Sequence, residues 1–176
     1  MLDLEKLVED CRAAVAMDPT HRTVAEVIKK AFEAPAAVLA AVGEPQASGL
    51  VPIYASRTLT ILNVIWKPNM TVLPHNHRMW AVIGIYGGRE DNIFWRRVKD
   101  DPSGRIEARG ATALSTGDVT ALGIDVIHSV TNPISKLTGA LHVYGGDFFA
   151  AERSEWDAEH LTEGSLDIAN TKALFG

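Results

Sequence analysis

The sequence has almost no cysteine, no long hydrophobic run and no dense cluster of basic residues. Its single cysteine, Cys11, excludes an internal disulfide. No stretch reaches the roughly 18 consecutive apolar residues of a membrane-spanning helix, and the first five residues lack the basic stretch of a signal peptide. Lysine and arginine number 17 against 22 acidic residues, a net charge of −5. We therefore expect a cytoplasmic protein that binds neither membranes nor nucleic acid.

What is present is the composition of one folded domain. Hydrophobic residues make up 47% and charged residues 22% of the chain, far from the composition of a disordered segment. A length of 176 residues is enough for one hydrophobic core and short for two. We expect a single domain over 1–176, as a monomer or a homodimer.

The first quarter of the sequence has helical periodicity. Apolar residues recur at helical spacing over about 2–17, which predicts an amphipathic helix. A second helix is predicted from about Thr23, a candidate N-cap with Glu26 three residues later. The run 36–42 favours a short third helix. We assign 1–45 to a helical N-terminal segment.

From about residue 50 the sequence changes to short β-branched and aromatic runs, separated by turn pairs such as Gly87-Gly88 and Asn132-Pro133. The expected strands are 57–66, 70–76, 78–86, 92–99, 105–110, 117–121, 126–131 and 137–145. Short strands at this spacing favour a sandwich or barrel, which we place at 50–149. The tail, 150–176, has weak helical periodicity around 155–160 and is expected to pack on the barrel.

Two histidines stand two residues apart in one predicted strand. Residues at this spacing point to the same face of a strand, so His75 and His77 present their imidazoles together. Taken alone this pattern is weak, because surface and core histidines meet it by chance. A third histidine in a matching context strengthens it.

The run 117–132 around His128 resembles the second motif of the cupin superfamily, G-x5-P-x-G-x2-H-x3-N, with every interval kept. Gly123 replaces the proline of the motif, and Asp125 replaces its second glycine. The resemblance implies a mainly β fold, the cupin double-stranded β-helix or jelly-roll barrel, here with an N-terminal helical segment.

The run 69–88 is similar to the first cupin motif, G-x5-H-x-H-x3,4-E-x6-G. Asn69 stands at the first glycine, and asparagine is the residue that best tolerates a left-handed turn. At the glutamate position the chain has Ala81 or Val82, which cannot bind a metal. The usual four ligands of the family are thereby reduced to three histidines, which leaves more open positions on the metal.

The resemblance implies that His75, His77 and His128 hold one divalent transition metal. We expect Fe(II), with Zn, Ni or Mn as alternatives. Glu90 and Asp91, just past the glycine turn, are alternative fourth ligands. The other interpretation of these two carboxylates is a solvated turn.

Among three-histidine cupins, the run 52–149 most resembles the thiol dioxygenases that act on cysteine or 3-mercaptopropionate. The segment around Arg57 resembles the family segment whose arginine binds the substrate carboxylate, which an arginine fits with two hydrogen bonds. A strand-edge arginine in water is the alternative interpretation. Arg78 is a rival carboxylate anchor, although a regular strand would place it opposite His77.

A late strand carries a second likeness to this family. Its Ala140-x-His142-x-Tyr144 pattern resembles the family's Ser-x-His-x-Tyr triad, in which the histidine positions the tyrosine hydroxyl beside substrate and O2. Alternation places these three residues on one face. Ala140 cannot donate the serine's hydrogen bond, and a histidine and tyrosine of the core are the alternative.

The resemblance as a whole implies a mononuclear non-heme iron dioxygenase. The expected partners are a small thiol carboxylate and O2, and the expected product is a sulfinate. Two alternatives stay open: a three-histidine cupin dioxygenase that cleaves C–C bonds of a diketone-type substrate, and a non-catalytic cupin that binds a metal or small molecule.

Overall fold

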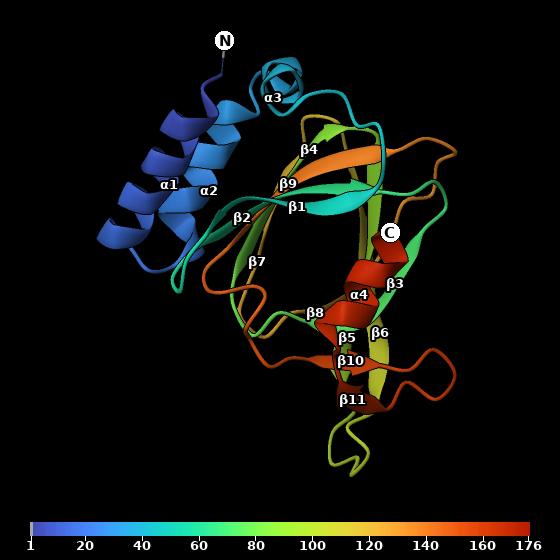
Figure 1. The fold of residues 1–176 in the computed structure, drawn as a ribbon. Helices are drawn as coiled ribbons and strands as arrows, with labels where there is room; N and C mark the ends of the chain where they lie inside the picture. The colour runs from blue at the N-terminus through green and yellow to red at the C-terminus, as the bar shows by residue number, and fades with distance from the viewer. Residues whose placement is uncertain (1) are drawn as a thin grey trace.

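Two antiparallel β-sheets face each other, and helices from the N-terminal part of the chain pack on the outside of one of them (Figure 1). The computed structural model describes residues 2–176. The helices in this part of the chain are α1 (Leu4–Met17), α2 (His21–Ala31), α3 (Pro35–Val42) and α4 (Ile168–Phe175). No helix between residues 2 and 176 combines the length and the apolar character that crossing a membrane requires.

The sheet beneath the helices, which we call the helix-covered sheet, has the order β1 (Gly49–Ala55), β2 (Thr60–Trp66), β9 (Thr138–Tyr144), β4 (Ala81–Gly87), β7 (Val119–Leu122). The second sheet has the order β11 (Glu163–Ser165), β10 (Ser154–Trp156), β3 (Thr71–Asn76), β8 (Ile127–Thr131), β5 (Arg89–Arg97), β6 (Ile106–Ser115). Strands distant in sequence are neighbours in both sheets, as in a jelly roll. This double-stranded β-helix with N-terminal helices confirms the predicted cupin fold class.

The alternation of β9 separates two hydrophobic cores. Leu141 and Val143 face outward into the cluster that the helices cover, whereas the cluster inside the barrel includes Ala140 and Tyr144. Every residue of this strand is buried, because both faces of the sheet are covered. The strand therefore carries one set of side chains for packing on helices and another for the barrel interior.

The helices fit closely against the sheet. Phe32, at the end of α2, is 4% exposed. Its ring packs on Gly84 of β4, where an added Cβ would lie 2.5 Å from the ring. Burial of an aromatic side chain of this kind contributes about 1.5–3 kcal/mol to folding.

The second helix begins earlier than the sequence pattern predicts. Its N-cap is Thr20, whose hydroxyl accepts a hydrogen bond from the Arg22 amide (3.4 Å), so the prediction of Thr23 as N-cap is wrong. Asp18 accepts from the Thr20 amide and hydroxyl, and this turn fixes the start of the helix one turn before the capping pattern.

The edges of the sheets also differ from the prediction. The strand β1 (Gly49–Ala55) was not expected: it is an edge strand of intermediate and exposed residues and contains Pro52. The predicted helical character of 155–160 is wrong, because β10 places Trp156 in a strand, where its indole donates to the Gly104 carbonyl (2.8 Å). The chain then continues through β11 into α4, which packs beside β1 (Figure 1).

Candidate metal centre

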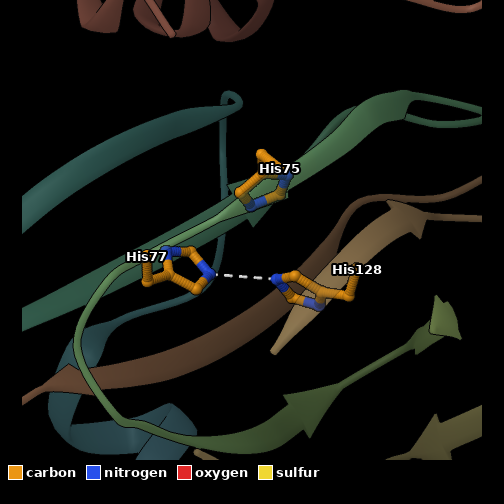
Figure 2. Close-up of side chains that lie close together, drawn as sticks. All are labelled: His75, His77 and His128. Carbon is orange, nitrogen blue, oxygen red and sulfur yellow. Dashed lines mark hydrogen bonds between the residues drawn. The ribbon is translucent and has the colours of Figure 1, made fainter. Parts of the chain in front are cut away.

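Three histidines converge inside the barrel (Figure 2). His75 lies in β3, His77 just beyond its end, and His128 in β8. One ring nitrogen from each lies within 4.8 Å of the others. All three side chains are buried, with exposed fractions of 8%, 5% and 1%. The sequence-predicted ligand set is therefore brought together in one place.

Local irregularity of the backbone aims these rings. The pairing of β3 with β8 shifts between Val72 and His75, after which His75 lies directly opposite His128. The strand then ends before His77, and Arg78 adopts a left-handed φ of 51°. The expected regular strand from residue 78 is thus wrong at its start, and β4 begins only at Ala81.

Hydrogen bonds determine the proton positions on two of the rings. His75 Nδ1 lies 2.8 Å from the Leu73 carbonyl oxygen, which can only accept, so Nδ1 carries the proton. His128 Nδ1 lies 2.7 Å from Asn92 Oδ1. Because the other end of this amide, Asn92 Nδ2, donates to Glu90 Oε1 (3.0 Å), His128 Nδ1 also carries a proton. Both Nε2 atoms are therefore unprotonated, the form that a metal binds.

The ring of His77 shares a proton with the ring of His128. His77 Nε2 lies 2.9 Å from His128 Nε2 (Figure 2). On the other side of His77, Arg153 Nη1 lies 3.5 Å from Nδ1, and a guanidinium can only donate. The proton of His77 is thus on Nε2, between the two rings. The three rings could hold one metal ion as neutral ligands once this proton moves from Nε2 to Nδ1 of His77.

Burial keeps the three imidazoles neutral. It lowers the pKa of His75 to about 4, and the neighbouring Arg153 adds to this shift. Burial, followed by the charge of the other histidines, holds the pKa of His77 and of His128 well below the ordinary value. Neutral imidazole is the metal-binding form, so at pH 7 no proton has to be removed from the group as a whole.

The histidines line a small cavity of about 30 Å³. The rest of its wall is mostly apolar and comprises Leu50, Val64, Trp66, Val72, Val130, His142, Tyr144, Phe148, Thr171 and Phe175. No lysine, arginine or carboxylate among the described residues lines it. Thr171 and Phe175 belong to α4, so this helix forms part of the wall over the site.

The predicted tyrosine and histidine lie at the same site. His142 Nδ1 and the Tyr144 hydroxyl are 2.9 Å apart, and both side chains line the cavity. The Tyr144 ring centroid lies 5.0 Å from that of His77. Burial raises the pKa of Tyr144 above its ordinary value, which keeps the phenol protonated. The hydroxyl is therefore a proton-bearing group beside the histidines.

The two arginines considered as carboxylate anchors lie elsewhere. Arg57 is exposed in the bend after β1 and lines a separate pocket of about 830 Å³ together with Glu9 and Arg12. Arg78 is exposed and donates to the Ser154 hydroxyl (3.3 Å). Neither lines the cavity that contains the histidines.

A buried arginine that the sequence patterns did not indicate lies against the site. Arg153 is 6% exposed, and its Nη2 donates to the Phe148 carbonyl (2.8 Å). Its guanidinium carbon lies 4.2 Å from the Phe148 ring centroid. Within residues 2–176 its Nε has no hydrogen-bond partner and no carboxylate pairs with it. No sequence signal indicated Arg153, because this residue comes after the last predicted strand, in a stretch that matches no motif.

The carboxylates considered as a fourth ligand are not part of the histidine group. Asp91 pairs with Arg89 (2.7 Å), as the alternative interpretation expected, but both residues lie in β5 and not in a turn. Glu90 is fully buried and lies beside Asn92 and His142. Glu90 and Asn92 are two residues apart in β5, and this alternation is a signal that could have revealed an inward polar face.

No protein-family model matches the chain. Among solved structures, it is similar to oxalate decarboxylase from Bacillus subtilis, with 17% identity, 63% of this chain covered and a TM-score of 0.43. The chain spans only 24% of the length of that protein.

Two further structures are similar over more of their own length. One is an RmlC-like cupin protein with a double-stranded β-helix fold from Methanocaldococcus jannaschii, at 10% identity, with 60% of this chain and 85% of that chain covered and a TM-score of 0.48. The other, from Klebsiella pneumoniae, has a double-stranded β-helix domain and matches at 10% identity over 64% of this chain and 83% of that chain, with a TM-score of 0.46. At such identities the likeness concerns the fold alone. By its own strand order the chain has the cupin fold, with a three-histidine candidate metal centre in the barrel.

Proposed function

We propose that this protein is an iron-dependent dioxygenase that adds both atoms of O2 to the sulfur of a small thiol carboxylate of the cysteine or 3-mercaptopropionate type. The observation that carries the proposal is the group of three buried, neutral histidines beside the hydrogen-bonded pair Tyr144 and His142. Three neutral ligands leave several positions of a metal free for other groups. A bound Fe(II) would supply the redox chemistry, and Zn, Ni and Mn are the alternative ions.

We place the carboxylate anchor at Arg153. A buried cation without a counter-charge is costly, so an anion brought by a substrate would stabilise it. Arg153 meets this condition, because its Nε is unpartnered and its Nη1 lies 3.5 Å from His77 Nδ1. Arg57, the anchor that the sequence resemblance favoured, lines the outer pocket instead.

The remaining groups of the site have roles that follow from their chemistry. The Tyr144 hydroxyl can donate or accept a proton at its oxygen, and His142 orients it through their hydrogen bond. The apolar wall excludes water, which strengthens the electrostatic interactions inside. Trp66 adds an unpartnered indole N–H at this wall.

Substrate entry requires a movement of the wall. The cavity of about 30 Å³ has room for about two or three water molecules, each of which needs about 10–15 Å³. A thiol carboxylate is larger. We therefore propose that α4, which contributes Thr171 and Phe175 to the wall, moves aside to admit it.

One observation favours a second candidate, the three-histidine dioxygenase that cleaves a diketone-type substrate. The cavity wall contains no charged side chain among the described residues, and a neutral diketone needs none. In this case Arg153 would be dispensable for turnover. With a thiol carboxylate, its replacement would weaken substrate binding.

The experiment that tests the proposal combines elemental analysis with O2 uptake. The purified protein is analysed for metal, loaded with Fe(II) without oxygen, and screened in an oxygen electrode with cysteine, 3-mercaptopropionate, cysteamine and acetylacetone. We expect uptake with a thiol carboxylate and a sulfinate product by mass spectrometry. Uptake with acetylacetone alone would support the second candidate. No uptake with any compound would leave a non-catalytic metal-binding cupin.

A further inference from the structure

A fully buried carboxylate joins the two sheets across the barrel. Glu90 comes from β5 of the second sheet, and its Oε1 accepts a hydrogen bond from Asn92 Nδ2 (3.0 Å). Its Oε2 lies 3.4 Å from His142 Nε2, on β9 of the helix-covered sheet. Among residues 2–176 neither of these last two atoms has a hydrogen-bond partner. A buried acceptor and a buried ring nitrogen thus face each other, and a proton on His142 Nε2 is what satisfies both.

This contact completes a row of five buried side chains. At one end, the Tyr144 hydroxyl lies 2.9 Å from His142 Nδ1, and His142 faces Glu90. At the other end, Glu90 accepts from Asn92, whose Oδ1 lies 2.7 Å from His128 Nδ1. The row therefore begins at the tyrosine beside the site and ends at one of the three histidines of the candidate metal centre.

Only a carboxylate satisfies both neighbours at this position. Asn92 presents a donor to Glu90, and His142 presents a second donor when its proton is on Nε2. A carboxylate has two acceptor oxygens, one for each, whereas an amide has one acceptor and one donor. With Oε1 occupied, Asn92 must turn its oxygen toward His128. With Oε2 occupied, neutral His142 must accept the Tyr144 proton at Nδ1, as in an acid–histidine–hydroxyl triad.

We propose that Glu90 is the positioning residue that sets the proton positions of both halves of the site: through Asn92 it holds the proton of His128 on Nδ1, and through His142 it orients the hydroxyl of Tyr144. As far as it concerns turnover, the inference rests on the proposed function. As far as it concerns proton positions, it holds for any metal and substrate.

The test measures histidine tautomers by ¹⁵N NMR in the metal-free protein, so that its outcome does not depend on activity. In the wild-type protein we expect a proton on Nε2 of His142 and on Nδ1 of His128. In Glu90→Gln the amide can satisfy only one neighbour, so at least one of these two rings should change tautomer. Unchanged tautomers on both rings would overturn the proposal.

A second variant keeps the test decisive if Glu90→Gln does not fold. In Tyr144→Phe the hydroxyl is lost, and we expect the proton of His142 to stay on Nε2 because Glu90 holds it there. Transfer of that proton to Nδ1 would show that Tyr144, not Glu90, sets the tautomer, and would overturn the proposal. A wild-type His142 with its proton on Nδ1 alone would overturn it as well.

Metal affinity supplies an independent readout, with Co²⁺ as a spectroscopic probe. Loss of a hydrogen-bond partner behind a ligand weakens metal binding by about 10- to 100-fold, and we expect this loss in Glu90→Gln if His128 is the ring that changes tautomer. The matched control is Tyr86→Phe, which removes a buried hydrogen bond to Asn63 (2.7 Å) outside the site. It should leave Co²⁺ affinity and both tautomers unchanged. Equal weakening in the two variants would contradict the proposal.

Discussion

The helix-covered face and the barrel interior bury side chains of different kinds. Beneath the helices the packing is almost entirely hydrocarbon, and polar groups there have partners: the Tyr86 hydroxyl donates to Asn63, and the Trp80 indole donates to the Pro19 carbonyl. In the interior, four buried polar atoms of the described residues have no hydrogen-bond partner: Trp66 Nε1, Glu90 Oε2, His142 Nε2 and Arg153 Nε.

The contrast separates the part of the molecule that stabilises the fold from the part that is organised for a ligand. Unsatisfied buried polar groups each cost about 1–3 kcal/mol, so a chain retains them where they serve another purpose. All four of these atoms belong to residues that line the histidine cavity or contact its lining residues. Mutations on the two sides should accordingly affect different measurements.

The largest effect is expected from loss of a candidate ligand in the interior. His128→Ala should weaken Fe(II) or Co²⁺ binding by more than about 100-fold, because loss of a supporting partner alone costs about 10- to 100-fold. O2 uptake should fall to background. The matched control is His160→Ala, at an exposed histidine outside the site. If His160→Ala weakened binding equally, the metal would lie elsewhere.

On the helix-covered face, the expected effect is on stability alone. Phe32→Ala should lower the free energy of unfolding by about 3–5 kcal/mol, because a buried aromatic ring packed on Gly84 is lost. Metal affinity of the folded fraction should stay within about twofold. Chemical denaturation and Co²⁺ titration measure the two quantities. If Phe32→Ala folded but did not bind metal, the helix-covered face would contribute to metal binding as well as to stability.

The pH dependence of stability should expose the buried histidines of the metal-free protein. Because the folded state lowers the pKa of His75 from 6.5 to about 4, the unfolded chain binds more protons in this window. Stability should therefore fall as the pH is lowered from about 6.5 to about 4, by up to about 3 kcal/mol from this residue. His75→Asn should remove that part of the slope. The same slope of stability against pH in the wild-type protein and in His75→Asn would contradict the lowered pKa of His75.

The smallest effect concerns the anchor for the substrate carboxylate. Arg153→Gln should raise KM for a thiol carboxylate by about 10- to 100-fold, the strength of a hydrogen bond to a charged group. The effect on cysteamine, a thiol that has an ammonium group and no carboxylate, should be far smaller. Arg57→Gln is the matched control and should leave KM unchanged. A raised KM in Arg57→Gln together with an unchanged KM in Arg153→Gln would show that Arg57, in the outer pocket, binds the carboxylate.

The parts of the site that depend on spacing within strands could be predicted from the sequence. His75 lies in β3 and His77 just beyond its end, and the motif interval to His128 reflects the pairing of β3 with β8. Likewise, alternation placed His142 and Tyr144 on one face of β9. The fold class followed from the same motifs and from the regular spacing of short strands.

The parts that depend on contacts between distant segments could not be predicted. Glu90 meets His142 across the two sheets, and Arg153 reaches His77 because the tail returns to the barrel as β10. Strand alternation carries no information about either contact. Arg57 was expected from a local likeness, but its position in a bend after β1 directs it to another pocket.

The most direct test of the account is the number of protons released when the metal-free protein binds Fe(II) or Co²⁺ at pH 5.5, measured by calorimetry in buffers of different ionisation enthalpy. Ordinary histidines, with a pKa near 6.5, would release between two and three protons per ion at this pH. Because burial lowers the pKa of His75, His77 and His128, we predict one ion per chain and well under one proton released. Release of two or more protons, or no saturation at one ion per chain, would contradict a buried centre of three neutral histidines.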